Sequence, residues 1–543
     1  MTPNTNRIAM KKLLTPLAIG ASYLLAIGCA DLAENPISGI TNSYYATPSG
    51  FDAAVSASYT PLRDWYGQEM GMTMTTFGTD EFTNGSDGSF KFFNTYDTQL
   101  NGDNQYSRDF WRSTYRAINT TNTVIGRAAT ANVPDATKAV RVGEAKFLRA
   151  LYFFNAVRTW GDIPMPLTET EGPQTEATRE PVAKVYDQII KDLTEAAAAL
   201  PATQSQFGRA TKPAAQHLLM TVYLTRAASG DFQKAADLGK GIINSGQFSL
   251  LPNFKDLWTF GNENNREIIW SVQFTPDLLT TGPGNSSHLY HTMAYDLEAG
   301  MVRDLANGRP FRRFRSTTWM YNNFDRTKDT RYDDSYTLAY ISNNPNNIPK
   351  DASGKPRWSV GDTALWFSPV EVDAAERAKH PYVIYAPSQY TEARFPSFNK
   401  KFIDPNRLLI NSVEGSRDWY VMRLADTYLQ VAEALIRDGK NAEAVPFINA
   451  VRERAAKAGV PKSAMDITAS DATLDFLLDE RARELGGEMT RWFDLVRTGK
   501  LIERVTKYNP QAAPNIKPTS VLRPIPNEQI TLTSNKFPQN PGY

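Results

Sequence analysis

The sequence predicts a mainly α-helical protein, a scaffold of tetratricopeptide-like helical hairpins that carries a loop-rich, irregular segment. Three observations support this prediction. Helical periodicity dominates residues 46–250 and 415–543, two similar hairpins lie about 200 residues apart, and residues 251–414 lack sustained periodicity. A hydrophobic fraction of 41% with 22% charged residues is ordinary for a globular chain, so a packed core is expected.

Residues 1–28 have the features of a signal peptide. Lys11 and Lys12 precede an apolar run over residues 13–28, which is shorter than the roughly 20 residues of a membrane-spanning helix. Cys29, the only cysteine, follows Gly28, an arrangement that resembles a bacterial lipobox. We expect acylation of Cys29, for example with palmitate, and an acylated tether over residues 29–45. The alternative is a plain secretory signal with an incidental cysteine.

The charge balance argues against a nucleic-acid partner. Removal of residues 1–28 takes away Arg7, Lys11 and Lys12 and leaves 56 basic against 58 acidic side chains. Binding to phosphates needs clustered Lys and Arg, and no strong basic block is present. We therefore expect no nucleic-acid binding.

The first scaffold part, residues 46–250, contains a series of predicted helices. Apolar spacing places them at residues 48–64, around residues 110–122, and at residues 136–160, 181–200, 211–229 and 231–245. Between the first two, residues 78–109 are rich in Gly, Asn, Asp and Ser with interspersed aromatic rings. This composition is typical of long exposed loops, and we expect these loops to carry ligand contacts.

Two helical hairpins share one layout. Tyr223-Leu224 precedes the turn at Gly230-Asp231 and a second amphipathic helix, and Tyr428-Leu429 precedes a similar turn at Gly439-Lys440. Tetratricopeptide-type pairs pack in this way, with small and large residues alternating across a helix, a tight turn and a second helix. Residues 415–543 are therefore expected to form the C-terminal part of the scaffold.

Residues 251–414 differ from both scaffold parts. They hold five of the ten tryptophans and many Pro, Gly, Asn and Tyr residues. We expect long loops and short strands packed on the helical frame, where recognition residues usually lie. The chain from Tyr508 onward contains seven prolines, which predicts an extended tail that wraps the surface.

Several motifs, in this order along the chain, resemble the SusD/RagB family of outer-membrane nutrient-uptake lipoproteins. The most specific block is Asp479-Glu480-Arg481-Ala482-Arg483-Glu484-Leu485, followed by Arg491-Trp492-Phe493-Asp494-Leu495. The other matching segments are Phe147–Phe154 with Trp160–Pro164, Arg309-Pro310-Phe311 with Trp319, Pro396–Phe402, Arg423–Ala434, Pro524-Ile525-Pro526 and Gln539–Tyr543.

The resemblance implies an α-helical scaffold of four tetratricopeptide-like pairs with a less regular ligand-binding half. It also implies a non-catalytic lipoprotein of the outer membrane that faces the cell exterior and binds an oligosaccharide or polysaccharide. A SusC-like TonB-dependent transporter is the implied partner.

A saccharide site needs exposed aromatic rings bordered by Asn, Asp and Arg, because sugar rings present an apolar C–H face edged with hydroxyls. Residues 78–109 and 285–366 have that mixture. The candidate ligand-binding residues are Tyr66, Asp80, Phe92, Tyr96, Asn101, Tyr290, Trp319 and Trp358. For each of them, a role in the core or in anchoring a loop is the competing interpretation.

Glu480 and Glu484 lie four residues apart on one predicted helix face, beside Arg481 and Arg483. A glycosidase pair needs one carboxyl kept protonated, whereas neighbouring arginines lower the pKa of both. We therefore predict buried ion pairs that hold the helix in place.

Two other functions stay open as alternatives, a lipid-anchored glycoside hydrolase and a peptide-binding tetratricopeptide-type scaffold. A metal or other cofactor is not expected. His288-x-x-His291 has a spacing suited to a metal, but no further ligand cluster follows it.

Overall fold

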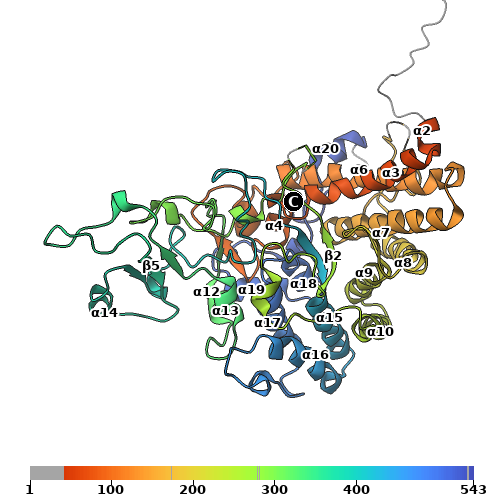
Figure 1. The fold of residues 1–543 in the computed structure, drawn as a ribbon. Helices are drawn as coiled ribbons and strands as arrows, with labels where there is room; N and C mark the ends of the chain where they lie inside the picture. The colour runs from red at the N-terminus through yellow and green to blue at the C-terminus, as the bar shows by residue number, and fades with distance from the viewer. Residues whose placement is uncertain (1–41, 171, 173, 278, 281, 535–536) are drawn as a thin grey trace, which may run out of the picture.

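The computed structural model describes residues 42–543 except residues 171, 173, 278, 281, 535 and 536 (Figure 1). The predicted signal peptide, the predicted lipid attachment at Cys29 and nearly all of the predicted tether lie outside the described residues.

The helical pattern of the first scaffold part produces a row of long helices, seen on the right of Figure 1. They are α3 (Pro48–Tyr59), α6 (Gln105–Arg127), α7 (Asp135–Trp160), α8 (Val182–Ala199), α9 (Lys212–Arg226) and α10 (Asp231–Asn244). These bounds confirm the helices predicted from periodicity to within a few residues. Shorter elements between α3 and α6 are α4 (Glu69–Thr75), β1 (Phe82–Asn84) and α5 (Phe92–Thr95), and α2 (Asn42–Ala46) precedes α3.

Local signals fix the ends of these helices. The Asn104 side chain accepts a hydrogen bond from Ser107 N at 2.9 Å and caps α6, which satisfies one of the free N–H groups of its first turn. α7 ends at Gly161, where φ is 75° and an added Cβ would lie 3.1 Å from Leu522. Glycine adopts this backbone conformation at little cost, so the chain turns sharply after α7.

The row continues in the C-terminal part of the chain. The helices there are α15 (Leu424–Arg437), α16 (Asn441–Arg454), α17 (Leu474–Leu485), α18 (Arg491–Arg497), α19 (Leu501–Tyr508) and α20 (Asn527–Leu532). α10 packs on α15 and α15 packs on α16, so the row is continuous in space although residues 245–423 separate α10 from α15. A core of small and aliphatic residues from α9, α10, α15, α16 and α17 fills this junction. The second predicted hairpin is the pair α15–α16.

Residues 245–423 leave the row and return to it. β2 (Ile268–Val272) pairs antiparallel with β7 (Trp419–Arg423), so the two ends of the segment lie together. Its other elements are α11 (Phe254–Leu257), β3 (Phe314–Ser316), α12 (Thr318–Asn322), α13 (Arg331–Ser335), β4 (Ala339–Ile341), β5 (Thr363–Phe367), α14 (Ala374–Ala378) and β6 (Val383–Tyr385). β4, β5 and β6 form one mixed sheet, on the left of Figure 1. Elements of three to five residues agree with the predicted loop-rich texture.

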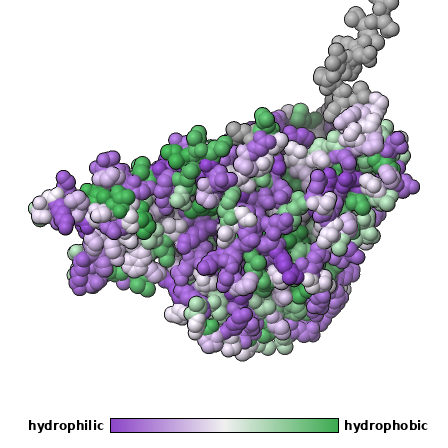
Figure 2. Space-filling view, in the orientation of Figure 1, coloured by the Kyte–Doolittle hydropathy of each residue, from purple (hydrophilic) through white to green (hydrophobic). Residues whose placement is uncertain are grey.

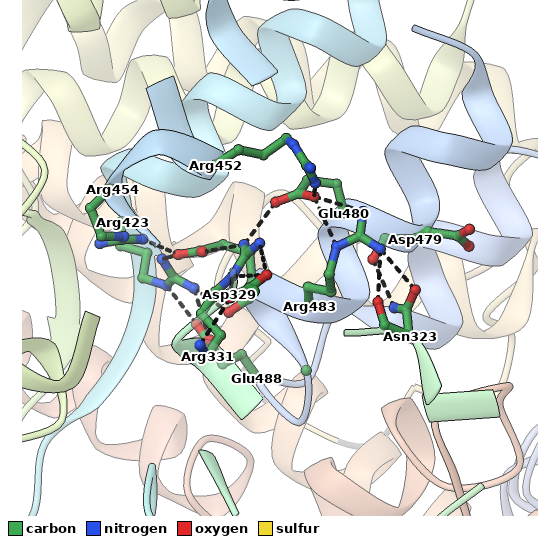
Figure 3. Close-up of polar contacts among 12 residues, drawn as sticks. Asn323, Asp329, Arg331, Arg423, Arg452, Arg454, Asp479, Glu480, Arg483 and Glu488 are labelled. Carbon is green, nitrogen blue, oxygen red and sulfur yellow. Dashed lines mark hydrogen bonds and ion pairs between the residues drawn. The ribbon is translucent and has the colours of Figure 1, made fainter. Parts of the chain in front are cut away.

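A buried network of charges joins this segment to the helix row (Figure 3). Glu484 of α17 accepts hydrogen bonds from Arg331 at 3.0 Å and from Arg423 at 2.7 Å, and it also pairs with Arg454. Glu480, one turn earlier, pairs with Arg331 at 2.7 Å. Both carboxylates are fully buried, which confirms the prediction of buried ion pairs.

The C-terminal tail, residues 509–543, runs back to the N-terminal part of the chain. Arg523 N donates to Thr159 O at 2.8 Å, and Asn540 Nδ2 donates to Trp160 O at 2.9 Å. The tail therefore contacts the C-terminal end of α7. It was predicted to be extended, but it contains the short helix α20.

Hydrophilic residues dominate the face seen in Figure 2, and hydrophobic residues form small separate groups on it. Among the described residues, the helices include none that is both long and apolar enough to cross a membrane.

Candidate ligand-binding site

Strand pairing brings together the two stretches that the sequence singled out. β1 and β3 are antiparallel, with Phe82 opposite Ser316 and Asn84 opposite Phe314. Beyond the strands, Gly85 N donates to Arg313 O at 2.9 Å. The loop after β1 and the loop before β3 therefore lie side by side, so parts of residues 78–109 and 285–366 form one surface.

Half-buried phenyl rings gather where these loops meet. Phe90 stacks on Tyr106, with ring centroids 3.8 Å apart and planes 17° apart, and Phe92 meets the edge of Phe90 at 6.1 Å. Phe311 packs edge-on against Tyr290 at 6.0 Å. Phe90, Phe92 and Phe311 are partly exposed, whereas Tyr106 and Tyr290 are buried. We call these five residues the aromatic surface; Phe90 packs on Tyr106 and Phe311 on Tyr290, whereas Phe92 packs against Phe90 and Phe93.

Two arginines border the aromatic surface. The Arg309 guanidinium lies 4.9 Å from the centroid of Phe311, within the range of a cation–π contact. Arg313 lies about equally far from two rings of the surface, 6.0 Å from Phe90 and 5.9 Å from Tyr290. Burial lowers the pKa of Arg313 to about 10, so this side chain stays charged at neutral pH.

The carboxylates next to the aromatic surface hold an arginine in place. Glu69 and Asp87 both pair with Arg313, Asp87 at 3.3 Å. Tyr290 donates its hydroxyl proton to Ser286 Oγ at 2.7 Å, and burial raises the pKa of Tyr290, which keeps the hydroxyl neutral. The arrangement offers fixed rings and, at Arg309, a partly exposed charged hydrogen-bond donor, which suits the binding of a ligand with an apolar face and polar edges.

Comparison with known proteins gives the family. Residues 266–543 match the family model described as the SusD family, and residues 44–224 match the one described as "Starch-binding associating with outer membrane". The first match alone spans more than half of the chain. The chain belongs to the SusD family.

Relatives in the SusD family match over most of their length. SusD-like protein P2 of Formosa agariphila is 26% identical and covers 96% of this chain and 98% of its own. The starch-binding protein SusD of Bacteroides thetaiotaomicron is 25% identical over 76% of this chain and 75% of its own. A solved structure described as a laminarin binding SusD-like protein has a TM-score of 0.70 and 25% identity, and covers 92% of this chain and 100% of its own. These matches confirm the family and the helical fold class that the sequence predicted.

Four of the eight candidate residues remain partly exposed or adjoin a partly exposed ring in this SusD-family structure. Phe92 belongs to the aromatic surface and Tyr290 lies beneath it. Trp319 is elsewhere, half-buried and stacked on Tyr508 with centroids 5.0 Å apart. The Asn101 side chain bonds within its own loop: it donates to Thr98 O and accepts from Asp103 N, both at 2.9 Å.

The other four candidates are buried. Asp80 is fully buried and bonds both Arg491 and Arg504. Tyr66, Tyr96 and Trp358 are at most 8% exposed. The structure gives these four side chains core or loop-anchoring positions, so we leave them out of the site. For Tyr96, the reason is that residues 78–109 offer few aliphatic side chains, so aromatic rings supply the apolar burial that holds these loops in place; Asp80 is buried as the partner of two arginines.

Sequence reasoning missed Phe90, Tyr106, Phe311, Arg309 and Arg313. Arg309 and Phe311 belong to the motif Arg309-Pro310-Phe311. Their separation by one residue in a predicted loop was the only sequence signal that a cation and an aromatic ring could pair there. Phe90 has a φ of 55°, a left-handed backbone that turns its ring toward Tyr106 and that no local pattern indicated.

The carboxylates and histidines singled out in the sequence form structural contacts within the fold. Burial alone would raise the pKa of Glu484, but the charges of Arg454, Arg423 and Arg331 bring it well below its usual value. A general acid needs the opposite shift.

His288 bonds Val413 O and Arg407, and His291 packs between aromatic rings. No group of three possible metal-ligating side chains occurs in the part of the chain that the structure describes.

Proposed function

We propose that this chain is a non-catalytic lipoprotein of the outer membrane, facing the cell exterior, that binds an oligosaccharide or polysaccharide and hands it to a SusC-like TonB-dependent transporter. The observation that carries the proposal is the aromatic surface, in which three partly exposed phenyl rings, two of them packed on tyrosines, lie beside Arg309 and Arg313. Two relatives, one described as starch-binding and one as laminarin binding, support a glycan as the ligand class.

The chemistry of the aromatic surface matches that of a sugar. A pyranose ring can stack its C–H face on Phe90 or Phe311, and its hydroxyls can accept hydrogen bonds from Arg309. Because Tyr106 fixes Phe90 and Tyr290 fixes Phe311, these two rings lose little side-chain freedom on binding. A few stacked rings give modest affinity, and anchoring beside a transporter compensates by raising the effective concentration.

The carboxylate pair that best fitted a glycoside hydrolase has a structural position. Glu480 and Glu484 are buried, and each is bonded to at least one arginine. Neither is positioned to protonate a glycosidic oxygen at a cleft. This supports a role in binding rather than cleavage.

The test of glycan binding is calorimetry of the full chain in detergent against starch, laminarin, pectin and sulfated algal polysaccharides. Phe90→Ala and Phe311→Ala should each weaken binding of the recognised glycan roughly tenfold, or about 1.4 kcal/mol, because each removes one stacking platform. Tyr44→Ala is the matched control, since Tyr44 is 41% exposed on α2, away from the β1–β3 loops. Undiminished binding by both surface variants would contradict this site, and release of reducing ends would contradict a binder without catalysis.

The anchor and the handover have their own test. Cys29→Ser should move the protein from the membrane fraction to the soluble fraction, because the acyl chains are the proposed anchor. The unmodified full chain should co-purify with a β-barrel transporter from detergent-extracted outer membranes. Retention of the Cys29→Ser variant on membranes would contradict the lipid anchor, and purification without a transporter would contradict the handover.

A further inference from the structure

The loop between α8 and α9, residues 202–211, has a surface hollow on each side. One hollow of about 360 Å³ lies between this loop and residues 264–270, and another of about 500 Å³ lies between it and residues 56–63 and 271–273. Gln206, Phe207, Gly208 and Arg209 line both hollows. We call the two hollows together the Phe207 groove; it is built from elements other than those of the aromatic surface.

The loop in the centre of the groove is fixed from several sides. Trp270 Nε1 donates to Gly208 O at 2.8 Å, and Ala210 N donates to the Tyr59 hydroxyl oxygen at 3.0 Å. Arg209 Nη1 donates to Glu144 at 2.9 Å. A groove held by such bonds is formed before any ligand arrives, which lowers the entropy cost of binding.

Phe207 stands exposed on this fixed loop. Its side chain is 36% exposed at the boundary of the two hollows, so its ring is available to both. The side chains around it are rich in amides, which carry a donor and an acceptor each and suit sugar hydroxyls. The amide residues that line the groove are Gln204, Gln206, Gln247, Asn264, Asn265 and Gln273.

The charge of the groove favours an acidic ligand. Arg63, Arg209 and Arg266 line it, and no Asp or Glu is among its described lining residues. Arg209 is neutralised by Glu144, whereas Arg266 is exposed and donates to a backbone carbonyl, that of Gly246, at 3.2 Å. A carboxylate or sulfate beside Arg266 would form a charge-assisted hydrogen bond without repulsion from a neighbouring acid.

We propose that the Phe207 groove is a second saccharide subsite, specific for an acidic oligosaccharide that bears uronate or sulfate groups. A sugar ring stacks on Phe207 and an acidic substituent pairs with Arg266. This subsite deepens the proposed glycan-binding function and rests on it.

Hydrogen exchange of the full chain in detergent separates the two proposals. The probes are hexagalacturonate, a sulfated carrageenan hexasaccharide and neutral maltohexaose. An acidic probe should slow exchange at residues 202–211 and 264–270, and a bound glycan should slow it at residues 86–92 and 309–314 of the aromatic surface. Uronate and sulfate are tested as separate arms.

Each pattern of protection from exchange supports or overturns one of the two proposed sites. Protection at the Phe207 groove by an acidic probe, and not by maltohexaose, supports the subsite and its ligand class. Protection at the aromatic surface alone overturns the subsite and leaves glycan binding intact. Equal protection of the groove by maltohexaose overturns the acidic specificity, and protection at neither place by any probe overturns both proposals.

Two variants test the named contacts. Phe207→Ala and Arg266→Ala should each weaken binding of the acidic probe about fivefold or more, with exchange at residues 86–92 unchanged. Arg266→Ala should also reduce the weakening of binding by added salt, since salt screens the ion pair that this variant lacks. Tyr44→Ala again serves as the exposed aromatic control. Wild-type affinity in both variants would rule the subsite out.

Discussion

At the scale of single residues, two adjacent buried acids differ in protonation state: one is ionised and the other keeps its proton. Burial alone would raise the pKa of Asp80, but Arg491 and Arg504 bring it below its usual value. Burial raises the pKa of Glu81 to about 8; Arg491, 3.5 Å away, opposes this shift and the neighbouring charge of Asp80 adds to it. Glu81 therefore keeps its proton at neutral pH, whereas Asp80 is ionised and holds the C-terminal helices to the β1 loop.

Glu81 should make stability fall as pH rises. An unfolded glutamate loses its proton near pH 4.3, while folded Glu81 keeps it to about pH 8. The free energy of unfolding therefore falls as pH rises between these values. Glu81→Gln cannot titrate. The free energy of unfolding of the wild type, relative to this variant, should fall by about 1 kcal/mol per pH unit between pH 5 and 7. Urea unfolding measures this difference. The control is Glu503→Gln on the exposed face of α19, which keeps Glu81, so the difference between the wild type and this variant should show no such slope.

At the scale of elements, the sequence predicts helices well and strand partners poorly. Residues 136–160 were identified because a long amphipathic pattern is local, and α7 spans Asp135–Trp160. β1 is three residues long and its partner β3 lies more than 200 residues away, so no local pattern indicates the pairing that creates the aromatic surface. The sequence also does not predict the burial of single loop residues: Phe92 is half-buried, whereas the adjacent Phe93 is fully buried.

Substitution of two glycines of α10 can distinguish the effect of packing from that of helix propensity. An added Cβ at Gly239 would lie 2.3 Å from Val431 of α15, whereas one at Gly241 meets nothing within 4 Å. Gly239→Ala should destabilise the protein by about 1–3 kcal/mol, because it pushes α10 away from α15. Gly241→Ala should stabilise it by about 0.5–1 kcal/mol through helix propensity alone. Thermal and urea unfolding compare the pair, and equal effects of the two substitutions would show that the α10–α15 contact is loose.

At the scale of the whole molecule, the charge network couples the irregular segment to the helix row. Glu267 and Arg331 come from residues 245–423, and Arg454 and Glu484 come from α16 and α17 (Figure 3). A buried ion pair contributes little compared with an apolar pair of the same volume, but removal of one partner leaves an uncompensated buried charge. We therefore expect the two parts to unfold together.

Acid should weaken this coupling. Despite burial, the neighbouring arginines hold the pKa values of Glu480 and Glu484 below those of an unfolded glutamate. Their stabilisation is therefore complete above about pH 4.3 and is lost as pH falls toward the folded values. Glu484→Gln should cost about 3 kcal/mol at pH 7, because Arg423 and Arg454 lose a buried counter-charge. In calorimetric scans the wild type should show one transition at pH 7, and its stability should approach that of Glu484→Gln as pH falls from 5 to 3. A constant difference between the two proteins over that range would mean that Glu484 does not carry the acid sensitivity, whereas Glu503→Gln should follow the wild type throughout.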